Sequence, residues 1–388
     1  MPNPVSFDFA LTPQVAMDYL TNKGFKLSFD YNELSPAVHH QAFTVAKVTR
    51  LDLLNDLFTS LDEALAQGKG FEQWQAELKP LLQQKGWWGK TEVINPKTGE
   101  VATIFVGARR LRTIYETNMR VAYGVQRYHS QQKLTQSVYW RYHSALLPTT
   151  RHSHSALHGM IFHRDHPFWN ENYPPNDWGC KCKVQAYSQR QLDRRGMTVT
   201  EQMPESIAGK DWRHNVGKGG SSVARLTQLI LADDLPKIAA NPELDALTDE
   251  QLKARFYQQL GVQPNEMMID KVGDPMWITD DLFKAHIFSK LRKRDRHLYF
   301  DAFADVVKDP DEIYLEVEQL RDKKGSRLVK KMFKYYEDAK NKRRGVMAIF
   351  EYQPDKTLGV SVYPIESETG TESRRKDKLI YKKEKSEL

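Results

Sequence analysis

The sequence predicts a multidomain protein: a mostly α-helical N-terminal domain with an irregular histidine–cysteine corner, followed by a small α+β domain with an antiparallel sheet. Three observations lead to this prediction. A chain of 388 residues is longer than one ordinary core supports, which indicates two or three domains. Apolar residues recur at helical spacing through much of the first 132 residues. Alternating apolar positions, typical of a β-hairpin, occupy residues 345–366.

Helices are the main elements expected before residue 133. Residues 12–24 carry a threonine cap, a proline at the first helical position and a terminal glycine, and residues 35–70 repeat this pattern. The apolar positions of the second stretch are Phe43, Ala46, Val48, Leu51, Leu54, Leu57 and Leu61. A short helix interrupted at Pro80 follows, and a long helix is expected over residues 108–133.

Less regular segments separate this region from the C-terminal domain. Residues 94–107 indicate a turn with a short strand, and residues 137–147 have the aromatic and β-branched content of a strand. Residues 209–222 are rich in Gly, Ser and Asn and indicate a loop. The expected organisation is therefore an N-terminal domain over 1–220, a helical linker over 221–264 and a C-terminal domain over 265–388.

The C-terminal domain is expected to combine helices with a small sheet. Its expected helices are 279–293, 296–307 and a basic helix near 326–341. The stretches "GVMAIFEYQP" and "TLGVSVYPIE" are joined by a short polar turn and predict a β-hairpin. The tail, from "RRKDKLIYKK", begins as a possible strand and ends in a charged terminus.

Charge points to a nucleic-acid partner for part of the chain. The formal net charge is +7, and residues 321–350 alone carry eleven Lys or Arg against three Asp or Glu, or +8. A positive patch suits nucleic acid, although a solvated helix face is the alternative. No stretch approaches the ~20 consecutive apolar residues of a membrane span, and the first residues lack a secretory pattern. We therefore expect no membrane partner.

The chain's two cysteines lie in "PPNDWGCKC", residues 174–182, just after five histidines. Zinc prefers thiolate and imidazole ligands, so Cys180 and Cys182 are candidate metal ligands together with His154 and His158, which would share a face of a helix. The spare candidates are His152, His163, Asp165 and His166. A Cys-x-Cys loop is tighter than the usual Cys-x-x-Cys, and two buried reduced cysteines in a polar loop, or a nucleophilic cysteine, are the alternatives.

A series of short motifs runs from the long helix through this corner. Its residues are Arg112, Ile114, Asn118, Arg151, His154, Leu157, His158, Gly159, Asp165, Pro167, Phe168, Trp169, Pro174, Pro175, Cys180 and Cys182. Over roughly residues 10–220 these motifs resemble the phage Mu F-like minor head proteins, with Cys-Lys-Cys in place of the usual Cys-Arg-Cys. Relatives with cysteine near the His154 position favour a structural zinc.

The resemblance implies a phage or prophage head-morphogenesis protein. Its expected partners are portal or procapsid proteins. Its expected location is the virion, in the capsid interior or at the portal, after a stage in the host cytoplasm.

The C-terminal residues carry a second resemblance. Two helical patterns are followed by the Asp-Pro-x-Glu-Ile step at residues 309–313, the hairpin, and an end with Thr, Arg and Leu-Ile-Tyr. This pattern is similar to a phage-borne branch of the barnase–EndoU–colicin–RelE nucleases. It implies a metal-independent RNase of toxin type, with RNA as substrate, no cofactor for catalysis and an immunity protein as a candidate partner.

Such RNA cleavage needs a base, an acid and cations around the phosphorane. The histidines His286 and His297 suit proton transfer because the pKa of imidazole lies near neutrality. The candidates for the other roles are Lys290, Arg344 and Arg374 as cations and Thr371 as a phosphate-orienting hydroxyl. The alternative is a purely structural assembly protein whose C-terminal domain only binds nucleic acid or a capsid partner.

Overall fold

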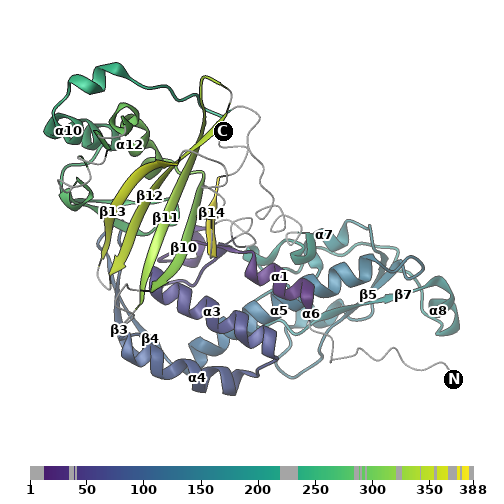
Figure 1. The fold of residues 1–388 in the computed structure, drawn as a ribbon. Coiled ribbons are helices and arrows are strands. Elements are labelled where there is room, and N and C mark those ends of the chain that lie inside the picture. The colour runs from purple at the N-terminus through teal and green to yellow at the C-terminus, as the bar shows by residue number, and fades with distance from the viewer. Residues whose placement is uncertain are drawn as a thin grey trace.

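The computed structural model describes residues 13–34, 39, 42–218, 235–283, 288, 291–292, 295–319, 326–340, 342–353, 356–365, 374–375 and 378–383. Figure 1 shows a helical part, built from the first half of the chain, beside a broad sheet with helices along one side, built from the second half. Among the described helices, none is both long enough and apolar enough to span a bilayer.

The longer helices of the N-terminal part are α1 (Gln14–Thr21), α3 (Leu51–Gln67), α4 (Phe71–Gln84) and α5 (Ala108–Gln132). The spacing of apolar residues predicted α3 and α5 correctly, and α3 buries Leu54, Leu57 and Leu61. It ends at Gly68, whose φ of 66° is the left-handed conformation that commonly terminates helices.

Two details of the expected helices are wrong. The helix expected from residue 35 begins only at Leu51, because Ala42–Phe43 form strand β2, parallel to β1 (Gly24–Phe25), and Lys47 has a φ of 60°. The β-branched residues around Lys47 favour extended backbone. Helix α4 runs through Pro80 without a break. Pro80 is exposed, so the carbonyl that it leaves unpaired one turn earlier can be solvated.

A β-hairpin and a small sheet complete the N-terminal part. Strands β3 (Gly89–Ile94) and β4 (Val101–Val106) form the hairpin. The predicted strand after α5 is confirmed as β5 (Tyr139–His143), the centre of an antiparallel sheet with β6 (Ile161–His163) and β7 (Lys183–Tyr187). The short helices are η1 (Tyr31–Glu33), α6 (His152–Ala156), α7 (Phe168–Asn172), α8 (Gln189–Arg194) and η2 (Lys210–Trp212). The N-terminal part thus consists of helices together with a hairpin and a small sheet, so it is not helical throughout.

The C-terminal part is built on a seven-stranded sheet in the order β14-β10-β11-β12-β13-β9-β8. The strands are β8 (Glu266–Ile269), β9 (Pro275–Ile278), β10 (Glu312–Gln319), β11 (Ser326–Glu337), β12 (Arg343–Gln353), β13 (Lys356–Ile365) and β14 (Lys378–Lys382). Neighbouring strands are antiparallel except β13 and β9. The predicted hairpin is confirmed as β12–β13, and the possible tail strand as β14.

The basic helix expected near residues 326–341 is wrong, because this segment is the long strand β11. Its lysines looked like a solvated helix face. In the structure, successive side chains of β11 lie on opposite faces of the sheet, and its lysines form ion pairs with carboxylates on both faces.

Helices cover one face of this sheet, as Figure 1 shows. They are α10 (Asp249–Leu260) and α12 (Asp301–Lys308), with the short helices η3 (Pro242–Ala246), η4 (Asp280–Phe283) and η5 (Arg296–Tyr299). Elements η5 and α12 fill the predicted helix 296–307, whereas much of the predicted helix 279–293 lies outside the described residues. Helix α10 falls in the expected linker but packs against α12.

The two parts share one buried core. The backbone N–H of Leu27 donates to the carbonyl of Val272 at 2.8 Å. The next residue, Gly273, has a φ of 93°, and a Cβ there would lie 3.0 Å from the Leu27 carbonyl oxygen, so this close approach favours glycine. Lys378 of β14 bonds the Thr21 carbonyl and lies 4.1 Å from the centre of the Phe58 ring.

Candidate functional site

The histidine–cysteine corner lies beside the sheet of β5, β6 and β7. Cys180 and Cys182 immediately precede β7, and His154 belongs to α6. All three side chains are buried. Asn176, also buried, accepts a hydrogen bond of 2.9 Å from the Tyr142 hydroxyl, which ties the loop before the cysteines to β5. The corner is therefore held by polar contacts as well as by the core.

The corner has the spacing of a metal site. Nδ1 of His154 lies 3.6 Å from Sγ of Cys180 and 3.7 Å from Sγ of Cys182. In a tetrahedral zinc site, with Zn–S bonds of about 2.3 Å and Zn–N bonds of about 2.0 Å, the S···N edge is about 3.5 Å. The three ligand atoms all lie within 4.8 Å of one another. Three of the four predicted ligands are therefore brought together.

The fourth predicted ligand, His158, does not join this group. Helix α6 ends at Ala156, and Gly159 with a φ of 90° turns the chain, so His158 lies beyond the helical face that carries His154. Its ring packs edge-on against His143 instead, with centroids 5.7 Å apart. The spare candidates His152, His163, Asp165 and His166 also lie outside the three-residue cluster.

The two thiols influence each other's pKa in opposite directions. The hydrogen bond with Cys180 lowers the pKa of Cys182 to about 4; burial opposes this shift, and His154 and Tyr142 assist it. The same hydrogen bond and burial raise the pKa of Cys180. Two buried thiols beside an imidazole form a donor set in which a metal ion can replace the thiol protons.

The structure describes three of the six predicted catalytic residues of the C-terminal part, and these three lie in different segments. His286, Lys290 and Thr371 lie outside the described residues. His297 is buried within η5, and its Nε2 lies 2.8 Å from Oδ1 of Asp245. Arg344 bonds Asp338 at 2.8 Å near the turn between β11 and β12, and Arg374 is half-buried just before β14.

Much of the predicted positive patch is neutralised inside the fold. Lys330 is fully buried and pairs with Asp270 and Asp274 from the β8–β9 hairpin. Burial lowers the pKa of Lys330, but the two carboxylates reverse the effect and raise it. Other ion pairs of this segment are Arg327 with Glu318 and Glu351, Lys331 with Glu316, and Lys334 with Asp309.

A different cluster lies on the sheet face opposite the helices. Strand alternation and register put Glu312, Phe333 and Met347 on one face, whereas Ile313, Met332 and Ala348 face the helices. We call Glu312, Tyr314, Tyr335 and Arg375 the Glu312 cluster. Glu312 is only 2% exposed, so its carboxylate needs internal partners.

Those partners occupy most of the hydrogen-bond acceptor positions of the Glu312 carboxylate. Nε and Nη2 of Arg375 donate to the two Glu312 oxygens, each at 2.8 Å. The Tyr335 hydroxyl donates at 2.7 Å and the Tyr314 hydroxyl at 3.3 Å. Burial lowers the pKa of Arg375, and Glu312 with the tyrosines more than reverses this. The two parallel hydrogen bonds to Glu312 hold the guanidinium plane of Arg375 in a fixed orientation, which bidentate recognition of a phosphate requires.

Comparison with known proteins follows the division into two parts. Residues 55–185 match the family described as Phage Mu protein F like protein, and residues 251–382 match the family described as phage-Barnase-EndoU-ColicinE5/D-RelE like nuclease2. The chain carries a Mu F-like domain and a nuclease2-like domain. The second match begins inside the expected linker and includes most of α10.

Two curated relatives match the N-terminal half. The chain is 38% identical over 193 residues to "Putative capsid assembly protein F" of Escherichia phage Mu, covering 49% of this chain and 44% of the relative. It is 37% identical over 191 residues to "Mu-like prophage FluMu F protein" of Haemophilus influenzae, covering 48% and 45%. The chain thus spans less than half the length of these relatives. No solved structure matches.

The Glu312 cluster joins the two ends of the nuclease2-like motif, a connection that sequence reasoning missed. Glu312 is the acid of the Asp-Pro-x-Glu-Ile step, and Arg375, the neighbour of the predicted cation Arg374, pairs with it across 63 positions of sequence. The available signal was the alternation of "EIYLEVEQ", which puts Glu312 and Tyr314 on one strand face. The Mu F-like motif residues His154, Cys180 and Cys182 were predicted correctly as a group.

Proposed function

We propose that the protein acts in head assembly of a phage or prophage through its Mu F-like domain. The observation that supports this most directly is the 38% identity to the capsid assembly protein of phage Mu over about half the chain. Its partners would then be portal or procapsid proteins, and its location the virion after a stage in the host cytoplasm. In a gradient of procapsids from the encoding phage, the full chain should co-sediment. A chain that stays at the top of the gradient contradicts the proposal.

The histidine–cysteine corner supports a structural zinc within this domain. Two thiols and one imidazole are buried at tetrahedral spacing in a segment with little apolar periodicity. Cys180, Cys182 and His154 would hold the ion, which would lock the loop before β7 to α6. His158 is not needed for this set.

The nuclease2-like domain supports a second activity, metal-independent RNA cleavage of toxin type. In that reaction the 2′-hydroxyl loses its proton, its oxygen attacks the phosphorus, and the 5′-oxygen leaves with a proton, so a 2′,3′-cyclic phosphate forms. The Glu312 cluster suits the phosphate, because Glu312 orients Arg375 while the remaining guanidinium N–H groups face outward from the fork. His286, Lys290 and Thr371 remain predicted contributors. An immunity protein is a predicted partner.

One feature favours a binding module instead. The carboxylate of Glu312 already accepts four hydrogen bonds, and His297 lies on the helix side of the sheet against Asp245. A saturated carboxylate is a weak proton acceptor. A fluorescent RNA incubated with the full chain and excess chelator separates the two functions. Cleavage to a cyclic phosphate supports the nuclease, whereas retention of intact RNA supports the binding module.

A further inference from the structure

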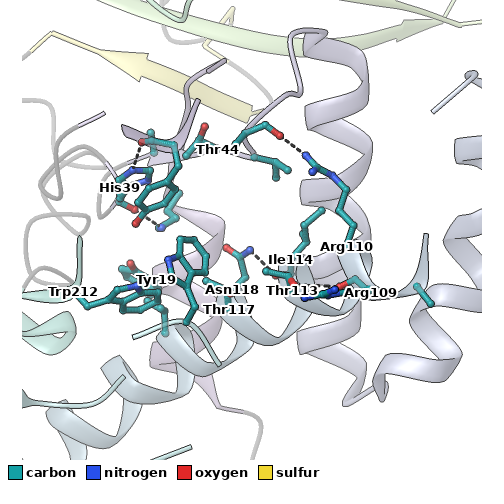
Figure 2. A pocket seen from close by; sticks show the side chains of 18 of the residues that line it. Tyr19, His39, Thr44, Arg109, Arg110, Thr113, Ile114, Thr117, Asn118 and Trp212 are labelled. Carbon is teal, nitrogen blue, oxygen red and sulfur yellow. Dashed lines mark hydrogen bonds between the residues drawn. The ribbon is translucent and has the colours of Figure 1, made fainter. Parts of the chain in front are cut away.

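The Mu F-like domain contains a cavity of about 590 Å³ between α5 and the segment that joins α1 to α3. Figure 2 shows His39, Thr44, Arg110, Ile114 and Trp212 arranged around its open centre. Its lining includes none of His154, Cys180 and Cys182 and no member of the Glu312 cluster, although Trp178, from the loop before Cys180, forms part of the wall.

One face of α5 forms the floor of this cavity. After Ala108 and Arg109 at the start of the helix, the lining positions are Arg110, Thr113, Ile114, Thr117, Asn118 and Val121, at alternating spacings of three and one. Such spacing places all of them on a single helical face. From Gly107 to Val121 this face extends about 20 Å. A length of that size accommodates about six residues of extended chain, more than a single small ion requires.

Buried hydrogen-bond donors line the same cavity. Lys23 is 6% exposed, and among the described residues the one hydrogen bond of its side-chain ammonium runs to the His39 carbonyl, at 2.7 Å. The Tyr19 hydroxyl and the Trp212 indole N–H are both buried without a hydrogen-bond partner in the described chain. Buried donors of this kind gain most from an acceptor that comes from outside the protein.

Charge in the cavity has one sign. The described residues that line it include the cations Lys23, Arg109 and Arg110 and no carboxylate. Burial lowers the pKa of Lys23 to about 7, which an anion in the cavity would raise again. The N-terminus of the 25-residue helix α5 also lies here, and its cap residue, Gly107, has no side chain to bond the first N–H groups.

Apolar and aromatic side chains supply the rest of the wall. Phe105 is 75% exposed at the rim, and Trp178 and Trp212 pack edge to face with centroids 5.4 Å apart. Val45 and Ile114 add aliphatic surface. A ligand that combines negative charge with apolar side chains complements this lining.

We propose that this cavity is a groove that binds a short peptide segment of a partner protein. The bound segment carries an acidic group beside apolar side chains. The carboxylate accepts from Lys23 and the neighbouring donors, and the apolar side chains pack on α5 and the tryptophans. The length of the groove and the aliphatic side chains of Val45, Ile114 and Val121 in its lining favour a peptide over single-stranded nucleic acid. This inference does not depend on the activity of the nuclease2-like domain.

Selection from a phage-displayed library of random seven-residue peptides on the immobilised full chain tests this proposal. We expect enrichment of sequences with Asp or Glu within two residues of Leu, Ile, Phe or Trp. Thr113→Trp and Thr117→Trp, which fill the groove, should abolish enrichment, whereas Thr135→Trp, an exposed threonine beyond the end of α5, should not. Enrichment of peptides without acid, or equal enrichment on Thr113→Trp, overturns the proposal.

Titration of the protein into the most enriched peptide, labelled with fluorescein, tests whether Lys23 binds the acidic group of the peptide. Lys23→Met should weaken binding at least tenfold, and Lys133→Met, at an exposed lysine, should leave it unchanged. One comparison replaces the C-terminal carboxylate of the peptide by an amide. A second replaces each Asp by Asn and each Glu by Gln. The replacement that weakens binding identifies the carboxylate that binds. Fluorescein-labelled (dT)12 is the opposing probe. If it binds wild type, is lost in Thr113→Trp, and no peptide is enriched, the groove is a nucleic-acid site.

Discussion

The hydroxyl group of Tyr352, in the nuclease2-like domain, donates a hydrogen bond of 2.9 Å to Oδ1 of Asp52, in the Mu F-like domain. These residues are 300 positions apart in sequence. Asp52 also pairs with Arg50 and Lys85, each at 2.9 Å, so the tyrosine joins an existing charged group. Together with the shared core, this contact packs the two domains against each other.

Removing that contact should loosen the domain interface. Tyr352→Phe deletes a half-buried hydrogen bond to a charged acceptor and should lower the free energy of unfolding by about 1–2 kcal/mol. Urea denaturation measures the change. Tyr123→Phe, at an exposed tyrosine of α5, is the matched control. An equal loss in an Asp52→Asn background would mean that the effect does not come from this pair.

Metal content tests the histidine–cysteine corner. The purified chain should contain about one zinc, and Cys180→Ser or Cys182→Ser should lose it together with thermal stability, because structural zinc contributes folding energy. His158→Ala should keep the metal, since its ring packs on His143 outside the cluster. Elemental analysis and melting temperature are the measurements. A folded, zinc-free wild type, or zinc lost in His158→Ala alone, contradicts the three-ligand assignment.

If the Glu312 cluster is the catalytic site, substitutions in it should reduce RNA turnover, whereas a substitution at His297 should reduce stability. Arg375→Lys keeps the charge but removes the planar fork, and should reduce RNA turnover by roughly 10²–10³ if the guanidinium binds the scissile phosphate. Arg374→Lys, on the adjacent arginine, should have a smaller effect. His297→Ala should mainly lower stability, because the imidazole contacts Asp245 on the helix side of the sheet. Loss of turnover only in His297→Ala would move the active site to that side.

Lys330 should be a stability residue rather than an RNA contact. Lys330→Ala leaves Asp270 and Asp274 buried without their cation, which costs about 3–5 kcal/mol. Urea denaturation measures this loss. Salt titration of RNA binding by wild type should give a slope set by exposed lysines and arginines, and a folded Lys330→Ala protein should retain that slope. A reduced slope would show that Lys330 reaches phosphate.

The buried Lys23 makes stability depend on pH. Burial lowers its folded pKa to about 7, against an ordinary value of 10.5. Between these values the unfolded state binds more protons, so this residue makes stability rise with pH, by at most about 1.4 kcal/mol per pH unit. Below about pH 7 both states are charged and the penalty is constant. The difference between wild type and Lys23→Met, measured by denaturation from pH 6 to 10, should shrink as pH rises. A constant difference contradicts the prediction.

Local sequence signals predicted many of the elements and part of the sites. Periodic apolar residues predicted α3 and α5, and alternation with a polar turn predicted the β12–β13 hairpin. These signals depend on interactions within a few residues of chain. Where charge competed with periodicity, as in β11, the prediction was wrong, because partners for its lysines come from β8–β9, β10 and the residues before β10.

The sequence by itself determined the resemblance to the two families, the main helices and hairpin, and the grouping of His154 with the cysteines, since motif and period are local properties. Only the tertiary structure decided that His158 turns away, that Lys330 is buried between two aspartates, and that Glu312 pairs with Arg375. The physical reason is that side-chain pairing and desolvation depend on which distant segments pack together. Spacing along the chain does not encode that packing.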